Sequence, residues 1–119
     1  MAIDQPRIGV VGVGHLGQHH VKHLAKMKRV RFSGIYDKDR SRAEKIASDY
    51  KIKSFNSLNE LIDGSDGLTV VTPTADHCAT ALKCIHKGKH VFIEKPISDS
   101  VKSANSLLRA AEDSGVLIQ

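Results

Sequence analysis

Apolar residues along the chain gather in short runs, separated by stretches in which they recur every three or four positions. Runs rich in β-branched residues are typical of strands buried on both faces of a parallel sheet. They predict strands at residues 7–13, 30–36, 51–55, 67–71 and 90–93, the third with the weakest pattern, and the opening of another at 116–119. Helical spacing between the runs predicts a series of right-handed βαβ units. The expected fold class is therefore α/β, a doubly wound parallel sheet with helices on both faces.

Polar residues with helix-capping side chains indicate where the helices should begin. Asp39 or Ser41 can begin the second helix, because a glutamate follows Ser41 by three residues, which is the spacing of a capping box. Ser57 is followed by a glutamate in the same way and should begin a short helix, while Ser98 or Asp99 should begin the last one. The apolar residues of the first helix that are expected to face the core are Leu16, Val21, Leu24 and Met27.

Composition and charge indicate one globular domain. Hydrophobic residues make up 40% of the 119 residues and charged residues 26%, which excludes a disordered chain and supports one core across residues 1–119. Lys and Arg number 18 against 13 Asp and Glu, and the net charge of +5 permits a phosphate-bearing partner without requiring one. No apolar run approaches the roughly 20 residues of a membrane span, and the N-terminus lacks the apolar stretch of a signal peptide. A cytoplasmic protein without membrane contact is expected, with Cys78 and Cys84, which lack CxxC spacing, as reduced, half-buried thiols.

The segment Gly12-Val-Gly14-His-Leu-Gly17 has the glycine pattern of a dinucleotide-binding loop and lies between a predicted strand and a predicted helix. Gly12 would permit a tight turn, Gly14 would let a pyrophosphate approach the backbone, and Gly17 would let the helix pack closely on the strand. His15 and Leu16 would contact the dinucleotide at the start of the helix, where backbone amides favour an anion. The alternative is a purely structural strand-to-helix turn, because glycine-rich turns occur in many unrelated proteins.

Asp37 lies 20 residues beyond Gly17 and directly follows the second predicted strand. A carboxylate there can accept hydrogen bonds from both hydroxyls of an adenosine ribose and would repel a 2′-phosphate, which favours NAD over NADP. Lys38, Arg40 and Arg42 lie close enough to accommodate that phosphate, so NADP stays possible. The alternative role for Asp37 is that of a helix cap or a solvated turn residue.

Two further motifs follow the fourth and fifth predicted strands, where a doubly wound sheet forms its ligand site. They are Thr72-Pro73 with His77, and Glu94-Lys95-Pro96. Together with Gly12 to Gly17, His20 and Asp37, these motifs make the chain resemble the Gfo/Idh/MocA family of oxidoreductases over essentially all of its length. A small departure is Thr74, where members of the family often have Asn.

The resemblance implies that residues 1–119 form the N-terminal NAD(P)-binding Rossmann domain of a longer oxidoreductase, whose C-terminal substrate domain is absent from this chain. Members of the family act mostly on sugars, cyclitols and nucleotide-sugars, so a small-molecule substrate of this class is expected. Homo-oligomers would form through the missing domain. The residues implied at the cofactor site besides the loop and Asp37 are Thr72, Pro73, His77, Glu94 and Lys95.

Lys95 is the candidate catalytic residue, since the family motif implies that it reaches both substrate and nicotinamide. Hydride removal from an alcohol requires the hydroxyl proton to leave, and an ammonium beside the reacting oxygen stabilises the developing charge. Glu94 could hold that ammonium in place. The alternative is a surface ion pair between these two residues, but neighbours on a strand point to opposite faces, which makes a local pair a poor explanation.

Three histidines, His15, His19 and His23, repeat at four-residue spacing on one face of the first helix, a spacing that can chelate zinc or nickel. No carboxylate or cysteine lies in the same turns, so no metal site is expected. A second function stays open, because relatives of the family can use the fold as a dinucleotide sensor without turnover. Nucleic acid is not expected as a partner, because the chain lacks aromatic platforms and a recognition motif.

Overall fold

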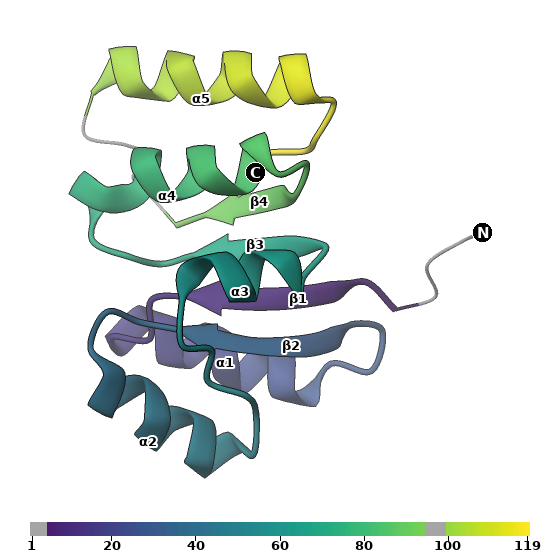
Figure 1. Ribbon diagram of the computed structural model, residues 1–119, viewed down its shortest axis with the longest axis vertical. Coiled ribbons are helices and arrows are strands. Elements are labelled where there is room, and N and C mark those ends of the chain that lie inside the picture. The colour runs from purple at the N-terminus through teal and green to yellow at the C-terminus, as the bar shows by residue number, and fades with distance from the viewer. Residues whose placement is uncertain (1–4, 95–99) are drawn as a thin grey trace.

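The computed structural model describes residues 5–94 and 100–119. Within this part of the chain, four parallel strands form one sheet: β1 (Arg7–Val11), β2 (Arg31–Tyr36), β3 (Gly67–Val70) and β4 (His90–Ile93). Figure 1 shows their order across the sheet, β2-β1-β3-β4. The chain winds outward from β1 to β2 and then returns to the other side of β1 for β3 and β4. The strand order therefore reverses between β1 and β3, which is where doubly wound sheets place their ligands.

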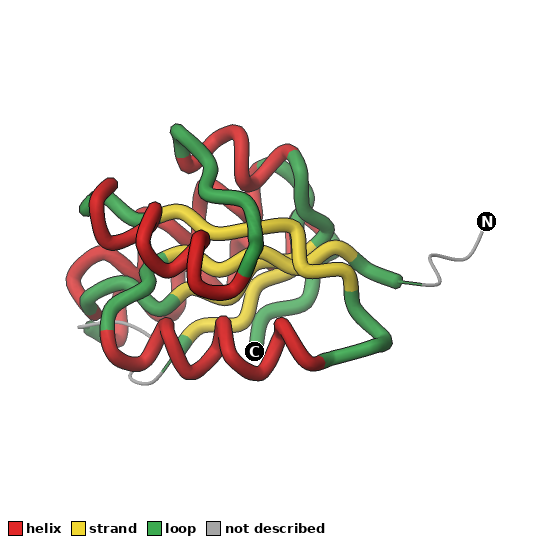
Figure 2. The backbone as a smooth tube through the Cα atoms, turned by 90° about the horizontal axis from the view of Figure 1, so that it is seen from below, coloured by secondary structure: helices red, strands yellow, loops and turns green. Residues whose placement is uncertain are grey.

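Helices cover both faces of the sheet, as the view in Figure 2 shows. They are α1 (His15–Lys26), α2 (Arg40–Tyr50), α3 (Leu58–Asp63), α4 (Thr74–His86) and α5 (Val101–Ser114). Among the described residues, apolar side chains form one cluster around Val10 with α1 and α2, and another around Val11 with α3, α4 and α5. The two valines serve opposite faces because side chains alternate along a strand. The predicted α/β class is confirmed, and no helix of the described residues is both long and apolar enough to cross a membrane.

Two of the predicted strands are reduced to single bridges. Ser54 pairs with Ile35 beside β2, and Ile118 pairs with Val91 beside β4, both in parallel. Residues 51–55 do not form the full strand that was predicted, because Lys51 adopts the left-handed conformation (φ 54°) that ends α2. The end of the chain runs beside β4 in the predicted direction. The bridges continue the parallel order at both edges of the sheet.

Side chains cap three of the helices, at positions that partly match the predictions. Asp39, rather than Ser41, begins α2, and its carboxylate accepts a hydrogen bond from the backbone nitrogen three residues later at 3.1 Å. Ser41 lies inside the helix, so the capping box predicted there is wrong. Ser57 begins α3 as predicted. Ser100 caps α5, and the starts predicted for this helix, residues 98–99, lie outside the described residues.

Two side chains of the first helical segment lie at the surface instead of in the core. Leu16 is 52% exposed and Met27 is 53% exposed, whereas Val21 is buried and Leu24 packs against the buried cluster. Met27 follows the last residue of α1, and Leu16 lies in its first turn. Helical spacing therefore predicts burial correctly in the middle of α1 and overestimates it at both ends.

Both cysteines are free thiols, as predicted, but they differ in burial. Cys78 is half-buried, whereas Cys84 is fully buried within the cluster that contains α4. Burial raises the pKa of the Cys84 thiol to about 12, because the thiolate would be poorly solvated there. The expectation of a half-buried Cys84 is therefore wrong, and this thiol is a packing residue.

Candidate functional site

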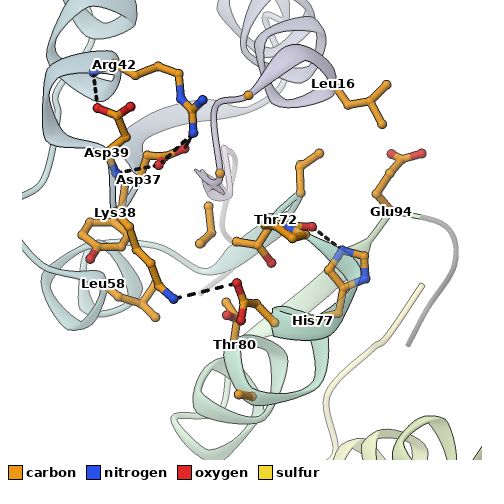
Figure 3. A pocket seen from close by; sticks show the side chains of 18 of the residues that line it. Leu16, Asp37, Lys38, Asp39, Arg42, Leu58, Thr72, His77, Thr80 and Glu94 are labelled. Atoms are coloured by element: carbon orange, nitrogen blue, oxygen red, sulfur yellow. Dashed lines mark hydrogen bonds and ion pairs between the residues drawn. The ribbon is translucent and has the colours of Figure 1, made fainter. Parts of the chain in front are cut away.

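A pocket of about 830 Å³ opens at the carboxyl ends of the strands. Its walls come from the segments that follow β1, β2, β3 and β4, together with the start of α1 and part of α4. Figure 3 shows side chains from these separate elements around one space. Cavities that hold small molecules and cofactors span about 300–1,000 Å³, so this volume suits such a ligand.

Most of the residues predicted from the sequence line this pocket. They are Gly12, Gly14, His15, Leu16, Asp37, Thr72, Pro73, His77 and Glu94. Gly17 is buried beneath the loop and is not part of the wall. Lys95 lies outside the described residues. The fold thus brings together four segments that are far apart in the sequence.

Gly12 and Gly17 are required by the packing of the loop. Gly12 turns the chain with φ +95° directly after β1, so this strand ends two residues earlier than predicted. A Cβ on Gly12 would lie 2.8 Å from backbone atoms of Val71, and a Cβ on Gly17 would overlap the carbonyl oxygen of Gly12. The tight turn and the close helix packing expected of these two glycines are both present.

Replacement of Gly17 by alanine is expected to destabilise the protein by about 3 kcal/mol, because α1 must move away from the loop to admit one methyl group. Urea unfolding measures this loss. Gly14→Ala is the matched control, since it adds the same methyl group to the same loop in open space. A Gly17→Ala variant as stable as the control would contradict the packing argument.

Gly14 differs from its neighbours because nothing in the described part of the chain lies within 4 Å of where its Cβ would be. It begins α1, and no side chain among the described residues caps this helix start. The same holds for α4, which begins at Pro73 in the wall of the pocket, whereas α2, α3 and α5 all have side-chain caps. The first amides of a helix lack partners within it and carry the positive end of its dipole. The start of α1 therefore offers the pocket backbone groups that suit a phosphate.

Asp37 lies at the end of β2 with only 9% of its side chain exposed. Its two oxygens accept hydrogen bonds from the backbone nitrogens of Val13 and Asp39, each at 2.8 Å. The Nη2 atom of Arg42 lies 3.3 Å from Oδ1 and 3.2 Å from Oδ2. Asp37 therefore ties the glycine loop to the start of α2, in addition to presenting a carboxylate to the pocket.

The three cationic side chains that follow Asp37 in the sequence, Lys38, Arg40 and Arg42, take different positions. Lys38 and Arg42 line the pocket, whereas Arg40 does not. Arg40 donates hydrogen bonds to the backbone and side-chain oxygens of Asn56 at 3.0 and 2.7 Å. The Nζ atom of Lys38 lies 3.8 Å from the carboxylate of Asp76 at the start of α4. Arg40 is therefore not placed to meet a ligand in the pocket.

Thr72 and His77 follow β3 and shape the turn into α4. His77 is buried, and its Nε2 atom donates to the carbonyl oxygen of Thr72 at 2.6 Å. The hydroxyl of Thr72 is buried and has no hydrogen-bond partner within residues 5–94 and 100–119. Buried polar atoms of folded proteins nearly always have a partner, which makes this hydroxyl a candidate contact for a bound molecule.

Glu94 follows β4 and is tied to α1 through His20. The Oε2 atom of Glu94 lies 2.9 Å from the Nε2 atom of His20, and both side chains are half-buried. The ring of His20 also packs against Phe92 of β4, with ring centroids 5.8 Å apart. This pair connects two motifs of the sequence, whereas the predicted contact between Glu94 and the ammonium of Lys95 lies outside the described residues.

Other residues of the pocket wall were not singled out as site residues in the sequence. They are Val11, Tyr36, Asp39, Leu58, Val71, Asp76, Ala79, Thr80 and Lys83. Asp76, Thr80 and Lys83 share one face of α4 at helical spacing. Because α4 follows β3 at the carboxyl ends of the strands, where the pocket lies, this helical spacing could have predicted these three residues as part of the site.

The histidine row on α1 lies at the helix surface. The rings of His15 and His19 meet edge to face, with centroids 5.1 Å apart. In the described part of the chain, no group of three or more His, Cys, Asp or Glu residues is placed to hold a metal ion. Of the three histidines of this row, His15 lines the pocket.

Comparison with known proteins agrees with this geometry. The model of the oxidoreductase family with the NAD-binding Rossmann fold matches residues 6–119. UDP-N-acetylglucosamine 3-dehydrogenase from Acidithiobacillus ferrooxidans is 34% identical over 107 residues, which cover 90% of this chain and 34% of that protein. Glucose-6-phosphate 3-dehydrogenase from Bacillus subtilis is 36% identical over 106 residues, which cover 89% of this chain and 30% of that protein. The crystal structure of GenD2 from gentamicin A biosynthesis in complex with NAD has a TM-score of 0.91 and 29% identity, covering 98% of this chain and 34% of its own.

The chain spans about a third of the length of the curated relatives it matches. The family match nevertheless extends over nearly all of the present sequence, and it includes every segment that lines the pocket. The chain therefore belongs to the Gfo/Idh/MocA family of oxidoreductases and has the NAD-binding Rossmann fold of that family.

Proposed function

We propose that this chain is the NAD-binding, N-terminal domain of a longer cytoplasmic oxidoreductase that acts on a hydroxyl of a sugar, a cyclitol or a nucleotide-sugar. The observation that carries the proposal concerns Gly14 in the pocket wall. Its backbone is accessible to a ligand, because no described atom lies within 4 Å of where its Cβ would be and no side chain of the described residues caps the start of α1. The substrate class is supported by relatives named as dehydrogenases of UDP-N-acetylglucosamine and of glucose 6-phosphate.

The residues of the pocket divide into three groups along the proposed dinucleotide. The pyrophosphate lies against Gly14, His15 and Leu16, where helix amides donate to its oxygens, and Gly12 and Gly17 shape that loop. The adenosine ribose lies at Asp37. The residues proposed for the nicotinamide end are Thr72, Pro73, His77, Glu94 and Lys95.

NAD, when bound, supplies the acceptor for the hydride of the alcohol. Lys95 stabilises the negative charge that develops on the alcohol oxygen as its proton leaves. The remainder of the longer protein binds the substrate, supplies further proton-transfer groups and forms the contacts of a homo-oligomer. The family resemblance supports these roles, and Lys95 directly follows Glu94, a residue of the pocket wall, in the sequence.

Calorimetric titration of the 119-residue chain with NADH tests the cofactor part of the proposal. Saturable binding of one NADH per chain is expected. If neither NADH nor NADPH binds at concentrations up to about 1 mM, where even weak specific binding would be detected, the proposed cofactor binding is contradicted. For the longer protein, a panel of sugars and inositols with NAD, followed by NADH absorbance, tests the substrate class. Tight NADH binding without turnover of any such hydroxyl would favour the sensor function instead.

Replacement of Asp37 by serine is expected to shift the ratio of the two affinities toward NADPH by at least about tenfold, because the charge that repels the 2′-phosphate is removed. The variant should also lose about 1–3 kcal/mol of stability, since the backbone nitrogens of Val13 and Asp39 lose their acceptor. The measurement is the ratio of Kd values for NADPH and NADH.

Asp49→Ser is the matched control for this change. It removes the same charge at an exposed position of α2 that is outside the pocket wall. The affinity ratio of the control is expected to stay within about threefold of wild type. A wild-type chain that already prefers NADPH would show that Asp37 does not select NAD.

A further inference from the structure

The backbone and the side chain of Glu94 are both held in place. Its backbone nitrogen donates to the carbonyl oxygen of Val70, at the end of β3, at 3.1 Å. Its Oε2 atom lies 2.9 Å from the Nε2 atom of His20, in the middle of α1. Among the described residues, His20 is the one side chain that contacts this carboxylate through a hydrogen bond or an ion pair. Glu94 is therefore anchored to β3 and to α1 at once.

The contact between His20 and Glu94 has a fixed direction. An ionised carboxylate only accepts hydrogen bonds, so His20 donates from Nε2. Both side chains are 26% exposed, and a charge-assisted bond is screened less when it is partly buried than at the open surface. The ring of His20 also packs against Phe92, with centroids 5.8 Å apart. His20 thus contributes two separable properties, an aromatic ring and an N–H donor.

The helix that carries His20 also provides the proposed pyrophosphate site. Gly14 begins α1, and His20 lies six residues later, which is about 9 Å along a helix. Of the two partners, Glu94 lines the pocket and His20 does not. Figure 3 shows the side chain of Glu94 directed toward Leu16, in the first turn of α1. One helix therefore fixes where the carboxylate of Glu94 lies relative to the pyrophosphate.

We propose that His20 is a positioning residue for hydride transfer, which acts through Glu94 on the placement of Lys95. Consecutive Cα atoms are about 3.8 Å apart, so an anchor at Glu94 sets the point to which Lys95 is attached. The inference rests on the proposed function, because it requires a dinucleotide at α1 and a hydroxyl substrate beside Lys95. A displacement of about 1 Å at a reacting group can lower a rate by about 100-fold. The donor on His20 therefore affects the chemical step more than the binding of the cofactor.

Two substitutions of His20 in the longer protein separate the donor from the ring. His20→Phe keeps a ring that can pack against Phe92 and removes the donor, whereas His20→Gln removes the ring and keeps an N–H donor. His20→Phe is expected to lower kcat by at least about tenfold, while the Kd of NADH stays within about threefold of wild type. His20→Gln should keep kcat within about threefold, because its amide can still hold Glu94. The measurements are calorimetric titration with NADH and steady-state kinetics with NAD and the sugar or inositol that the wild type oxidises fastest.

His23→Phe is the matched control, because it places the same ring at an exposed position of α1 outside the pocket wall. Its kcat should stay within about threefold of wild type. A double variant tests whether His20 acts through Glu94. Adding His20→Phe to Glu94→Ala should lower kcat by less than about threefold further, because the acceptor is already missing.

A His20→Phe variant with the kcat of wild type would overturn the inference. So would equal losses of kcat and NADH affinity, which indicate general damage to α1, or a further tenfold loss in the double variant. A loss of at least about tenfold in kcat for His20→Gln would assign His20 to packing through its ring, and this variant decides the question even if His20→Phe does not fold. A wild type that binds NADH and oxidises no sugar or inositol contradicts the proposed function itself, so the two failures can be told apart.

Discussion

Gly14→Val is expected to abolish the binding of NADH while leaving the protein folded. No atom of the described chain lies within 4 Å of the added Cβ, so the new side chain occupies pocket space at the start of α1, where the proposed pyrophosphate lies. A loss of at least about 100-fold in affinity is expected, which is about 2.8 kcal/mol. Calorimetric titration measures the affinity, and urea unfolding should show a free energy within about 1 kcal/mol of wild type.

Ala25→Val is the matched control for this variant. It introduces the same valine side chain within α1, at an exposed position outside the pocket wall, and its NADH affinity should equal that of wild type. Gly14→Ala should fall between wild type and Gly14→Val. If Gly14→Val binds NADH as wild type does, the pyrophosphate does not lie on this loop and the dinucleotide assignment fails.

Lys95→Ala, in the longer protein proposed above, is expected to lower kcat by about 10²–10⁴-fold, the usual contribution of a positioned proton-transfer group. Its effect on the Kd of NAD should be much smaller, because the ammonium acts on the charge that develops at the alcohol oxygen during hydride transfer. Steady-state kinetics with the preferred hydroxyl substrate and calorimetric titration with NAD give the two quantities.

Lys102→Ala serves as the control for Lys95→Ala, since Lys102 is an exposed lysine on α5 and is not part of the pocket wall. Its kcat should lie within about threefold of wild type. A similarly small change in Lys95→Ala would assign Lys95 to a surface ion pair with Glu94, because exposed pairs contribute little.

The glycine loop could be predicted from the sequence because its glycines meet local steric demands. Gly12 has a positive φ, and Gly17 has no room for a Cβ, so any chain that makes this turn into this helix needs glycine at both positions. The alternation of strands and helices was predictable for a similar reason, since burial on both faces selects β-branched runs. These features depend on residues close together in the chain.

Contacts between distant segments could not be predicted in the same way. Val13 and Asp37 are 24 residues apart, and His20 and Glu94 are 74 apart. Sequence patterns singled out most of these residues separately, but only the packed sheet shows that they meet. The position of Arg42 over Asp37 likewise depends on where α2 begins, and the capping pattern left two starting points open.

β1 precedes β2, β3 and β4 in the chain, yet it lies in the interior of the sheet between β2 and β3. Ile8 pairs with Phe32 on one side and with Gly67 on the other, so its second neighbour leaves the ribosome long after the first. The backbone of Val71, which packs against Gly12, follows later still. Pairing between such distant segments slows folding and leaves apolar surface exposed in the meantime. A nascent chain that ends before Val71 therefore has a glycine loop without its supporting backbone, and the pocket forms only once synthesis has passed this point.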